Sequence, residues 1–124
     1  MKHINEKLLT VNELVERFVA IAIEQDKAIF SEETTKYNRL FDQMKAIVQE
    51  LKKRSGDQRL ALMPLYAHPN VHVRLKAAIY TLDIARADAR EVLESIADSP
   101  QYPDEAADAR LTLWRLDGTS PVKA

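Results

Sequence analysis

The chain contains no cysteine, and only two glycines and five prolines occur among its 124 residues. The absence of cysteine excludes disulfides, thiolate chemistry and zinc sites with cysteine ligands. The scarcity of glycine disfavours tight β-hairpins and glycine-rich phosphate-binding loops. The longest apolar run, residues 18–23, is too short for a membrane span or a signal-peptide core. These absences predict a helical cytoplasmic protein that does not bind membranes.

Positive and negative charges are nearly balanced, with 18 Lys and Arg residues against 19 Asp and Glu and a net charge of −1. Such a chain has no overall field that would attract nucleic acid or an anionic membrane. Hydrophobic residues make up 46% of the sequence and charged residues 30%, which is typical of a globular protein. The length indicates one domain.

Apolar residues recur three and four positions apart, which predicts helices in the first half of the chain. Thr10 and Glu13 form a capping box that begins a helix of about residues 10–26, and residues 27–32 break the pattern. A second helix ends at the Ser-Gly pair 55–56. Its apolar stripe is unbroken and consists of Tyr37, Leu40, Phe41, Met44, Ile47, Val48 and Leu51.

Four shorter helices are predicted in the second half. Their expected N-caps are Asp57, Asn70, Asp88 and Asp104, because short polar side chains accept hydrogen bonds from the first free backbone N–H groups of a helix. Pro64 lies inside the first of these helices and should kink it, because proline has no N–H to donate.

The second half of the sequence also repeats itself. Residues 57–69 align with residues 88–100, with Asp, Arg, Leu, an aliphatic residue and Pro recurring at an offset of 31. Residues 79–83 align with residues 113–117 at an offset of 34. A period of this size with two helices in each unit is typical of an α-solenoid.

Residues 68–78 resemble the inter-helix turn and second helix of a HEAT-like repeat, in which a Val-Arg pair and small alanines allow close helix packing. The second copy departs from this pattern, because Ala107 and Asp108 replace the pair. With segments 37–41 and 113–116, the chain as a whole resembles a short bacterial family of domains of unknown function with a HEAT-like, armadillo-type fold. The resemblance implies a fold but no activity and no catalytic residues.

We therefore expect an all-α chain of about six helices, paired as antiparallel hairpins and stacked into a short HEAT-like α-solenoid. The expected parts are a flexible N-terminus (1–9), a single helical domain (10–118) made of a capping hairpin (10–56), repeat one (57–86) and repeat two (87–118), and a tail (119–124).

No pattern in the sequence predicts a catalytic residue, a cofactor or a metal site, and we expect the chain not to be an enzyme. His68 and His72 are four residues apart, but Pro69 and Asn70 between them keep the two from sharing one helix face. The paired carboxylates occur at helix starts, where negative charge stabilises the helix dipole.

A partner-binding rim is the main functional prediction. Tyr66 and Tyr102 flank predicted turns, and tyrosine is a frequent anchor in protein interfaces. We expect Arg74 to pair with Asp57, Asp83 or Asp108, as the arginine of a HEAT repeat bridges its neighbours. The candidate rim consists of Tyr66, His68, His72, Arg74 and Tyr102.

Three functions fit these patterns. The first is a protein-interaction module whose partner is unknown, such as a bacterial immunity, inhibitor or adaptor protein. The alternative is a nucleic-acid-binding or processing subunit of the HEAT-like type, which the balanced charge disfavours and which would require surface cations to converge. A homodimer is also possible if residues 18–23, which are apolar on every side, form an interface.

Overall fold

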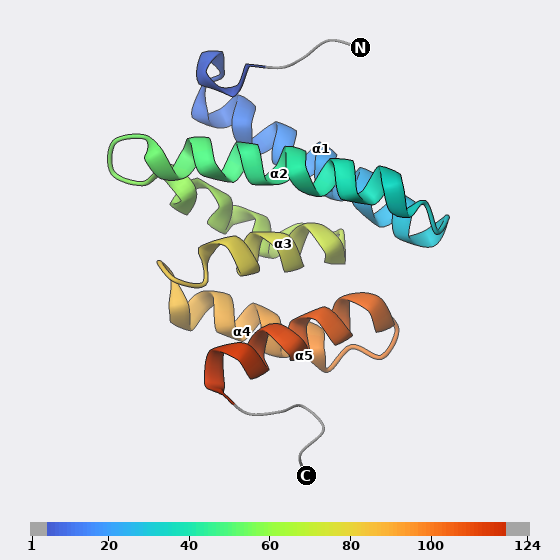
Figure 1. The fold of residues 1–124 in the computed structure, drawn as a ribbon. Helices are drawn as coiled ribbons and strands as arrows, with labels where there is room; N and C mark the ends of the chain where they lie inside the picture. The colour runs from blue at the N-terminus through green and yellow to red at the C-terminus, as the bar shows by residue number, and fades with distance from the viewer. Residues whose placement is uncertain (1–4, 119–124) are drawn as a thin grey trace. The chain divides into compact units, whose positions relative to one another are not determined.

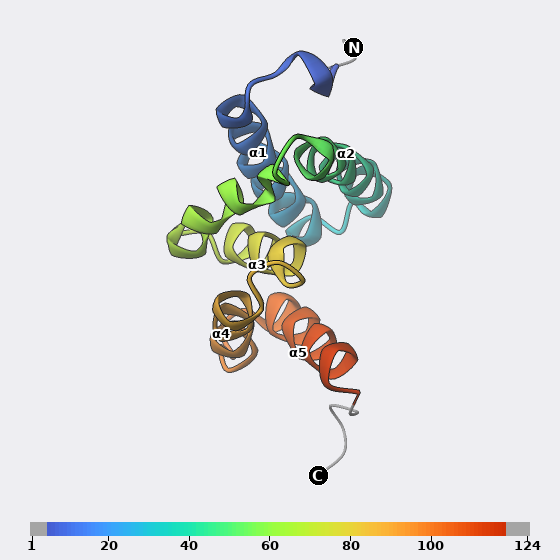
Figure 2. The ribbon, with the colours of Figure 1, turned by 90° about the vertical axis from the view of Figure 1, so that its left-hand side faces the viewer.

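The computed structural model describes residues 5–118, which form five α-helices and two 3₁₀ helices and, over that range, no strand (Figures 1 and 2). The predicted all-α class is confirmed. Within the described range no helix is both long and apolar enough to cross a membrane. Residues 1–4 of the expected flexible terminus and the expected tail, 119–124, lie outside the described residues. The chain divides into two compact units, Met1–Leu62 and Met63–Ala124.

The N-terminal unit contains an antiparallel pair of long helices, α1 (Val11–Phe30) and α2 (Thr34–Lys53) (Figure 1). Each helix is amphipathic, so pairing them removes both apolar faces from water. The predicted stripe of α2 is buried except at its first aromatic positions, since Tyr37 is half-buried and Phe41 is 37% exposed. The core of the pair comprises Leu14, Phe18, Ile21, Ala22, Leu40, Met44, Ile47, Val48 and Leu51.

Hydrogen bonds define the beginning of α1. The capping box is confirmed: Thr10 Oγ1 accepts from the Glu13 amide at 3.1 Å, and the Thr10 amide donates to Glu13 Oε1 at 2.8 Å. Residues 5–9, expected to be flexible, include a short 3₁₀ helix, η1 (Glu6–Leu8). Arg54, which follows α2, donates from Nη2 to the Leu9 carbonyl at 2.6 Å and to the Glu6 carbonyl at 3.2 Å. Its Nε donates to Glu50 at 2.8 Å.

The end of α1 lies four residues beyond the predicted position. Residues 27–30 include neither glycine nor proline, so nothing in the backbone stops the helix there. It stops where Glu32 adopts a left-handed conformation with φ of 58°. The Glu32 amide donates to the Ile29 carbonyl at 3.1 Å and the Glu33 amide to the Ala28 carbonyl at 2.9 Å. This pair of bonds is a Schellman motif with glutamate at the position where glycine is most common.

Three helices form the C-terminal unit: α3 (Val71–Thr81), α4 (Arg86–Ala97) and α5 (Pro103–Asp117). Helices α3 and α5 run in the same direction and α4 runs opposite to them (Figure 1). Every pair among the three is in contact. Small alanines allow this close approach. The buried cluster consists of Val71, Leu75, Ala78, Ala89, Leu93, Ile96 and Ala109.

Asn70 is the N-cap of α3, as predicted, and its side chain accepts from the amides of His72 and Val73. The other two cap predictions for this unit are wrong, because Asp88 and Asp104 lie inside the first turns of α4 and α5. An acidic side chain in a first turn still stabilises the helix dipole, which is why the residue type alone does not fix the boundary.

The helix predicted at residues 57–67 is a 3₁₀ helix, η2 (Gln58–Ala67), instead of a kinked α-helix. Pro64 lies inside it and supplies no amide hydrogen. Asp57 accepts from the Arg59 amide at 3.3 Å and from Arg59 Nη2 at 2.7 Å, so it braces the start of η2.

The left-handed residue at the end of α1 leads to a stability prediction. Glu32→Gly should raise the free energy of unfolding by about 1 kcal/mol, because glycine adopts a positive φ without the steric cost that a Cβ imposes. Urea denaturation would measure the change. Glu33→Gly, one residue later in the same loop, is the matched control and should give no such gain. A loss of stability in Glu32→Gly would contradict the assigned conformation.

Candidate functional site

A buried pair between α3 and α5 underlies the predicted rim. His72 Nδ1 lies 3.1 Å from Glu105 Oε2, and the two residues are 1% and 6% exposed. An ionised carboxylate only accepts hydrogen bonds, so Nδ1 carries the hydrogen. Each residue lies in the first turn of its helix, so the pair brings the starts of α3 and α5 together.

A second pair continues the alignment one turn along. Lys76 Nζ lies 3.9 Å from Asp108 Oδ2, with the lysine side chain buried and the aspartate partly exposed. The two pairs are four residues apart on α3 and three apart on α5, which is the spacing of neighbours on one helix face. Together they fix the register of two parallel helices within the C-terminal unit.

The environment of Glu105 favours its charged form. Burial alone would raise its pKa, but the hydrogen bond from His72, the charge on His72 and the charge on Lys76 together lower the pKa below its usual value. The carboxylate therefore remains ionised at neutral pH. His72, predicted to belong to the rim, lies beneath the surface as part of this pair.

Two other predicted rim residues, His68 in the turn before α3 and Arg74 in the first turns of the helix, make hydrogen bonds to this turn. Arg74 Nη1 donates to the carbonyls of His68 at 2.8 Å and Pro69 at 3.1 Å. The expected aspartate partner of Arg74 is therefore wrong, because the guanidinium satisfies two backbone carbonyls of the turn that no helix uses. The Asn70 amide donates to His68 Nδ1 at 3.0 Å. The side chains of His68 and Arg74, each half-buried, therefore both stabilise the turn.

The two rim tyrosines differ in their surroundings. Tyr66 is half-buried, packs against the core cluster and donates its hydroxyl hydrogen to Thr81, which itself donates to the Ala77 carbonyl at 2.7 Å. Burial raises the pKa of Tyr66. Tyr102 is the N-cap residue of α5 and is 36% exposed. Of the two predicted anchors, Tyr102 is the one available to a partner.

Because His72 and Glu105 join the first turns of α3 and α5, the turns that lead into these helices are neighbours. The candidate site is this edge of the C-terminal unit, which we call the α3–α5 edge, consisting of His68, Pro69, Arg74 and Tyr102 above the His72–Glu105 pair.

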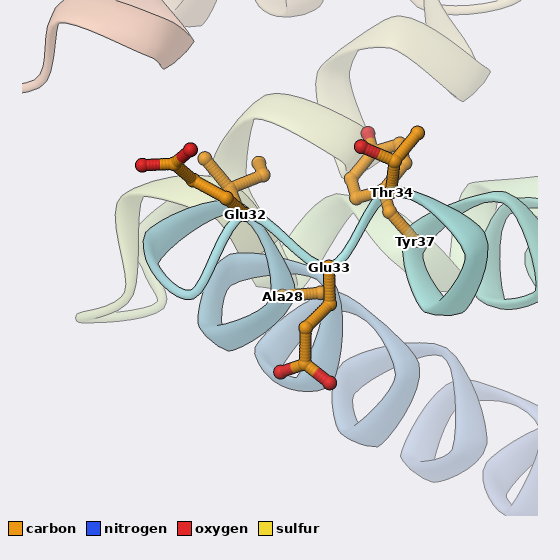
Figure 3. Close-up of a pocket in the computed structure, with 6 residues that line it drawn as sticks. Ala28, Glu32, Glu33, Thr34 and Tyr37 are labelled. Atoms are coloured by element: carbon orange, nitrogen blue, oxygen red, sulfur yellow. The ribbon is translucent and has the colours of Figure 1, made fainter.

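An open pocket of about 350 Å³ lies at the turn between α1 and α2 in the N-terminal unit (Figure 3). The sequence does not predict this pocket, because residues 27–32 only break the helical pattern there. Ile29, which continues the apolar pattern of α1 and lines the pocket, is the signal for it in the sequence. The lining residues are Ala28, Ile29, Glu32, Glu33, Thr34 and Tyr37.

Comparisons with known proteins give a family match and a structural match. A family model described as Domain of unknown function (DUF2019) matches residues 12–117. The chain is also similar to the protein RPA1889 from Rhodopseudomonas palustris CGA009, whose crystal structure gives a TM-score of 0.89. That protein is 42% identical, and the match covers 94% of this chain and 95% of the other. No curated protein matches this chain.

The buried pair leads to a pH prediction. Glu105→Gln keeps the side-chain shape but removes the charge, so at about pH 7 it should lower the free energy of unfolding by about 1–3 kcal/mol. Folding lowers the pKa of Glu105 below its unfolded-state value of 4.5, so the ionised carboxylate stabilises the folded protein at pH values above 4.5. This stabilisation is lost as the pH falls through the pKa of Glu105 in the folded state. The wild-type and variant stabilities should therefore converge on acidification.

Urea denaturation at several pH values from about 7 to about 3 would measure both curves. Glu91→Gln removes an exposed carboxylate from α4 and serves as the control, with little change expected at any pH. A constant gap between wild type and Glu105→Gln over the whole range would contradict the lowered pKa.

Proposed function

The chain belongs to the family described as Domain of unknown function (DUF2019), and we propose that it acts as a protein-interaction module. The observation that carries the proposal is the exposed ring of Tyr102 at the start of α5, which the His72–Glu105 pair joins to the start of α3. On the α3 side, Arg74 braces the preceding turn with two hydrogen bonds. Tyrosine and arginine are among the residues that contribute most to protein interfaces.

Rigidity supports the assignment. The His72–Glu105 pair and the Arg74 bonds hold the edge in one conformation before any partner binds. A surface that is already ordered loses little conformational entropy on binding, so more of the contact energy appears as affinity. Removing one partner of a buried pair such as His72–Glu105 would leave the other without a partner and would destabilise the unit. The pair therefore keeps the two helix starts together, which supports a recognition surface at this edge.

We also propose the finer fold assignment, in which α3 is the second helix of one HEAT-like repeat and α4 and α5 form the next repeat. The shared direction of α3 and α5, opposite to that of α4, supports it. In such repeats the second helices form an extended binding surface. A cytoplasmic immunity, inhibitor or adaptor protein of a bacterium would use a surface of this kind to hold one protein partner.

The proposal predicts a difference between two aromatic residues of equal exposure. Tyr102 at the start of α5 and Trp114 near its end are both 36% exposed. Tyr102→Ala should reduce the yield of partner co-purified with the chain at native expression levels by about tenfold or more. Trp114→Ala should leave that yield unchanged. Quantitative mass spectrometry of the two eluates would compare them.

Two results would contradict the module. The wild-type chain could elute alone as a monomer at native levels, or both alanine variants could retain the same partner at the same yield. Circular dichroism of each variant would show that the helices remain folded, since neither side chain belongs to the buried cluster.

Nucleic-acid binding is the second candidate, and the charge of α2 favours it. This helix carries five basic and two acidic residues, although the whole chain has a net charge of −1. Lys45 and Lys52 are seven residues apart and therefore share one exposed face, and Lys45 lies over the ring of Phe41 at 5.6 Å from its centroid. Cations and an aromatic ring on one face suit a phosphate backbone and its bases.

If α2 binds nucleic acid, fluorescence anisotropy with a labelled single-stranded oligonucleotide should detect binding at low salt. Raising the salt about fourfold should weaken it strongly, because bound cations are released from the phosphates. The double variant Lys45→Gln and Lys52→Gln should weaken binding by about tenfold, whereas Arg86→Gln on α4, equally exposed, should not. No binding by wild type at low salt would remove this candidate.

A further inference from the structure

Phe30, the last residue of α1, is 91% exposed, which is the largest value among the exposed large hydrophobic residues of the described chain. Single exposed apolar residues need no explanation, but an aromatic ring displayed almost completely on an ordered helix end is unusual. The ring also borders an open hollow of about 450 Å³ with Asp26, Lys27 and Ser31.

The backbone that displays Phe30 is fixed on both sides. The Schellman bonds from Glu32 and Glu33 to Ile29 and Ala28 close the end of α1 immediately after it. The Ser31 amide donates to the Lys27 carbonyl at 3.0 Å. The ring is therefore presented by a hydrogen-bonded turn, so its exposure does not arise from fraying of the helix.

The α1–α2 corner, defined as Phe30 with the hollow that it borders and the separate pocket lined by Ile29, Glu32, Glu33 and Tyr37, combines an exposed aromatic ring with two concave surfaces at the end of α1. Ile29 and Tyr37 are half-buried and supply apolar surface to the pocket. Figure 3 shows the carboxylates of Glu32 and Glu33 pointing to different sides of the loop. The two carboxylates would therefore pair with two separate cations and could not coordinate one cation jointly.

The charge at the corner is not compensated locally. The two nearby lysines are already engaged, since Glu24 lies 3.2 Å from Lys27 Nζ and 3.5 Å from Lys36 Nζ. Within residues 5–118, the side chains of Glu32 and Glu33 make no hydrogen bond or ion pair, and both are exposed. The corner thus presents two exposed carboxylates, without an ion pair among the described residues, on the loop that directly follows the exposed ring of Phe30.

We propose that the α1–α2 corner docks a cationic segment of a partner protein, in which an apolar side chain is flanked by two arginines or lysines. The apolar side chain would pack against Phe30 in the hollow that its ring borders, and the two cations would lie near Glu32 and Glu33 on the loop that follows. Complementary charge around an aromatic anchor gives such a contact its selectivity. The proposal rests on the protein-interaction function but uses residues of the N-terminal unit, whereas the α3–α5 edge consists of residues of the C-terminal unit.

The test is selection from a phage-displayed library of random dodecapeptides on the immobilised full chain. The expected result is enrichment of peptides with two or more basic residues flanking an apolar one. Affinity of the enriched peptides should fall about tenfold in Phe30→Ser and by a similar factor in the double variant Glu32→Gln and Glu33→Gln, measured by fluorescence anisotropy. Raising the salt should weaken wild-type binding.

A matched control removes side chains of the same kinds, one apolar and one acidic, near the opposite end of the hairpin. Leu8→Ser with Glu16→Gln deletes an apolar side chain that is 79% exposed and one exposed carboxylate, and it should leave peptide affinity unchanged. Enrichment of acidic or uncharged peptides, no enrichment at all, or equal loss in the control would overturn the proposal. Light scattering that showed a dimer lost in Phe30→Ser would also overturn it, because the corner would then bind a second copy.

The two proposals can fail separately. If Tyr102→Ala releases the natural partner but no cationic peptide binds the corner, only the inference about the corner is wrong. If cationic peptides bind the corner but the natural partner is indifferent to Tyr102, the assignment of the α3–α5 edge is wrong.

Discussion

The arrangement of the C-terminal unit depends on one requirement: a charge placed in a protein interior must meet an opposite charge or a hydrogen-bond donor. His72 and Glu105 satisfy each other at 3.1 Å, and this contact is possible only when the first turns of α3 and α5 lie side by side. Apolar packing alone tolerates sliding of one helix along another, whereas a directional hydrogen bond does not. The pair therefore fixes the register of α3 against α5.

The elements themselves could largely be predicted from the sequence. The stripes of α1 and α2, the capping box at Thr10 and the cap at Asn70 depend on residues within a turn or two of each other, so their spacing is visible in the sequence. Local signals failed where two structures satisfy them equally well. Asp88 and Asp104 stabilise a helix dipole from inside the first turn as well as from the cap position.

The site was harder to predict, because its decisive contact joins residues 33 positions apart. His72 follows Pro69 and Asn70 in a stretch that has the polar character of a surface turn. Only the fold shows that His72 is buried against Glu105. Arg74 met a similar difficulty, since its partners are backbone carbonyls that every residue possesses. Tyr102 is predicted as a partner anchor from its place beside a turn; its side chain is 36% exposed, and its role as an anchor stays a prediction.

The contacts of Arg54 have a consequence for how the N-terminal hairpin moves. Helix ends normally fray independently, since their last turns have the fewest bonds. Here one guanidinium bonds to Glu50 in the final turn of α2 and to the carbonyls of Glu6 and Leu9 ahead of α1. Opening either end breaks bonds that belong to the other, so the two termini of the hairpin should open as one cooperative unit. The two helices are thereby linked at both ends of the hairpin, by the covalent loop between them at one end and by the Arg54 side chain at the other.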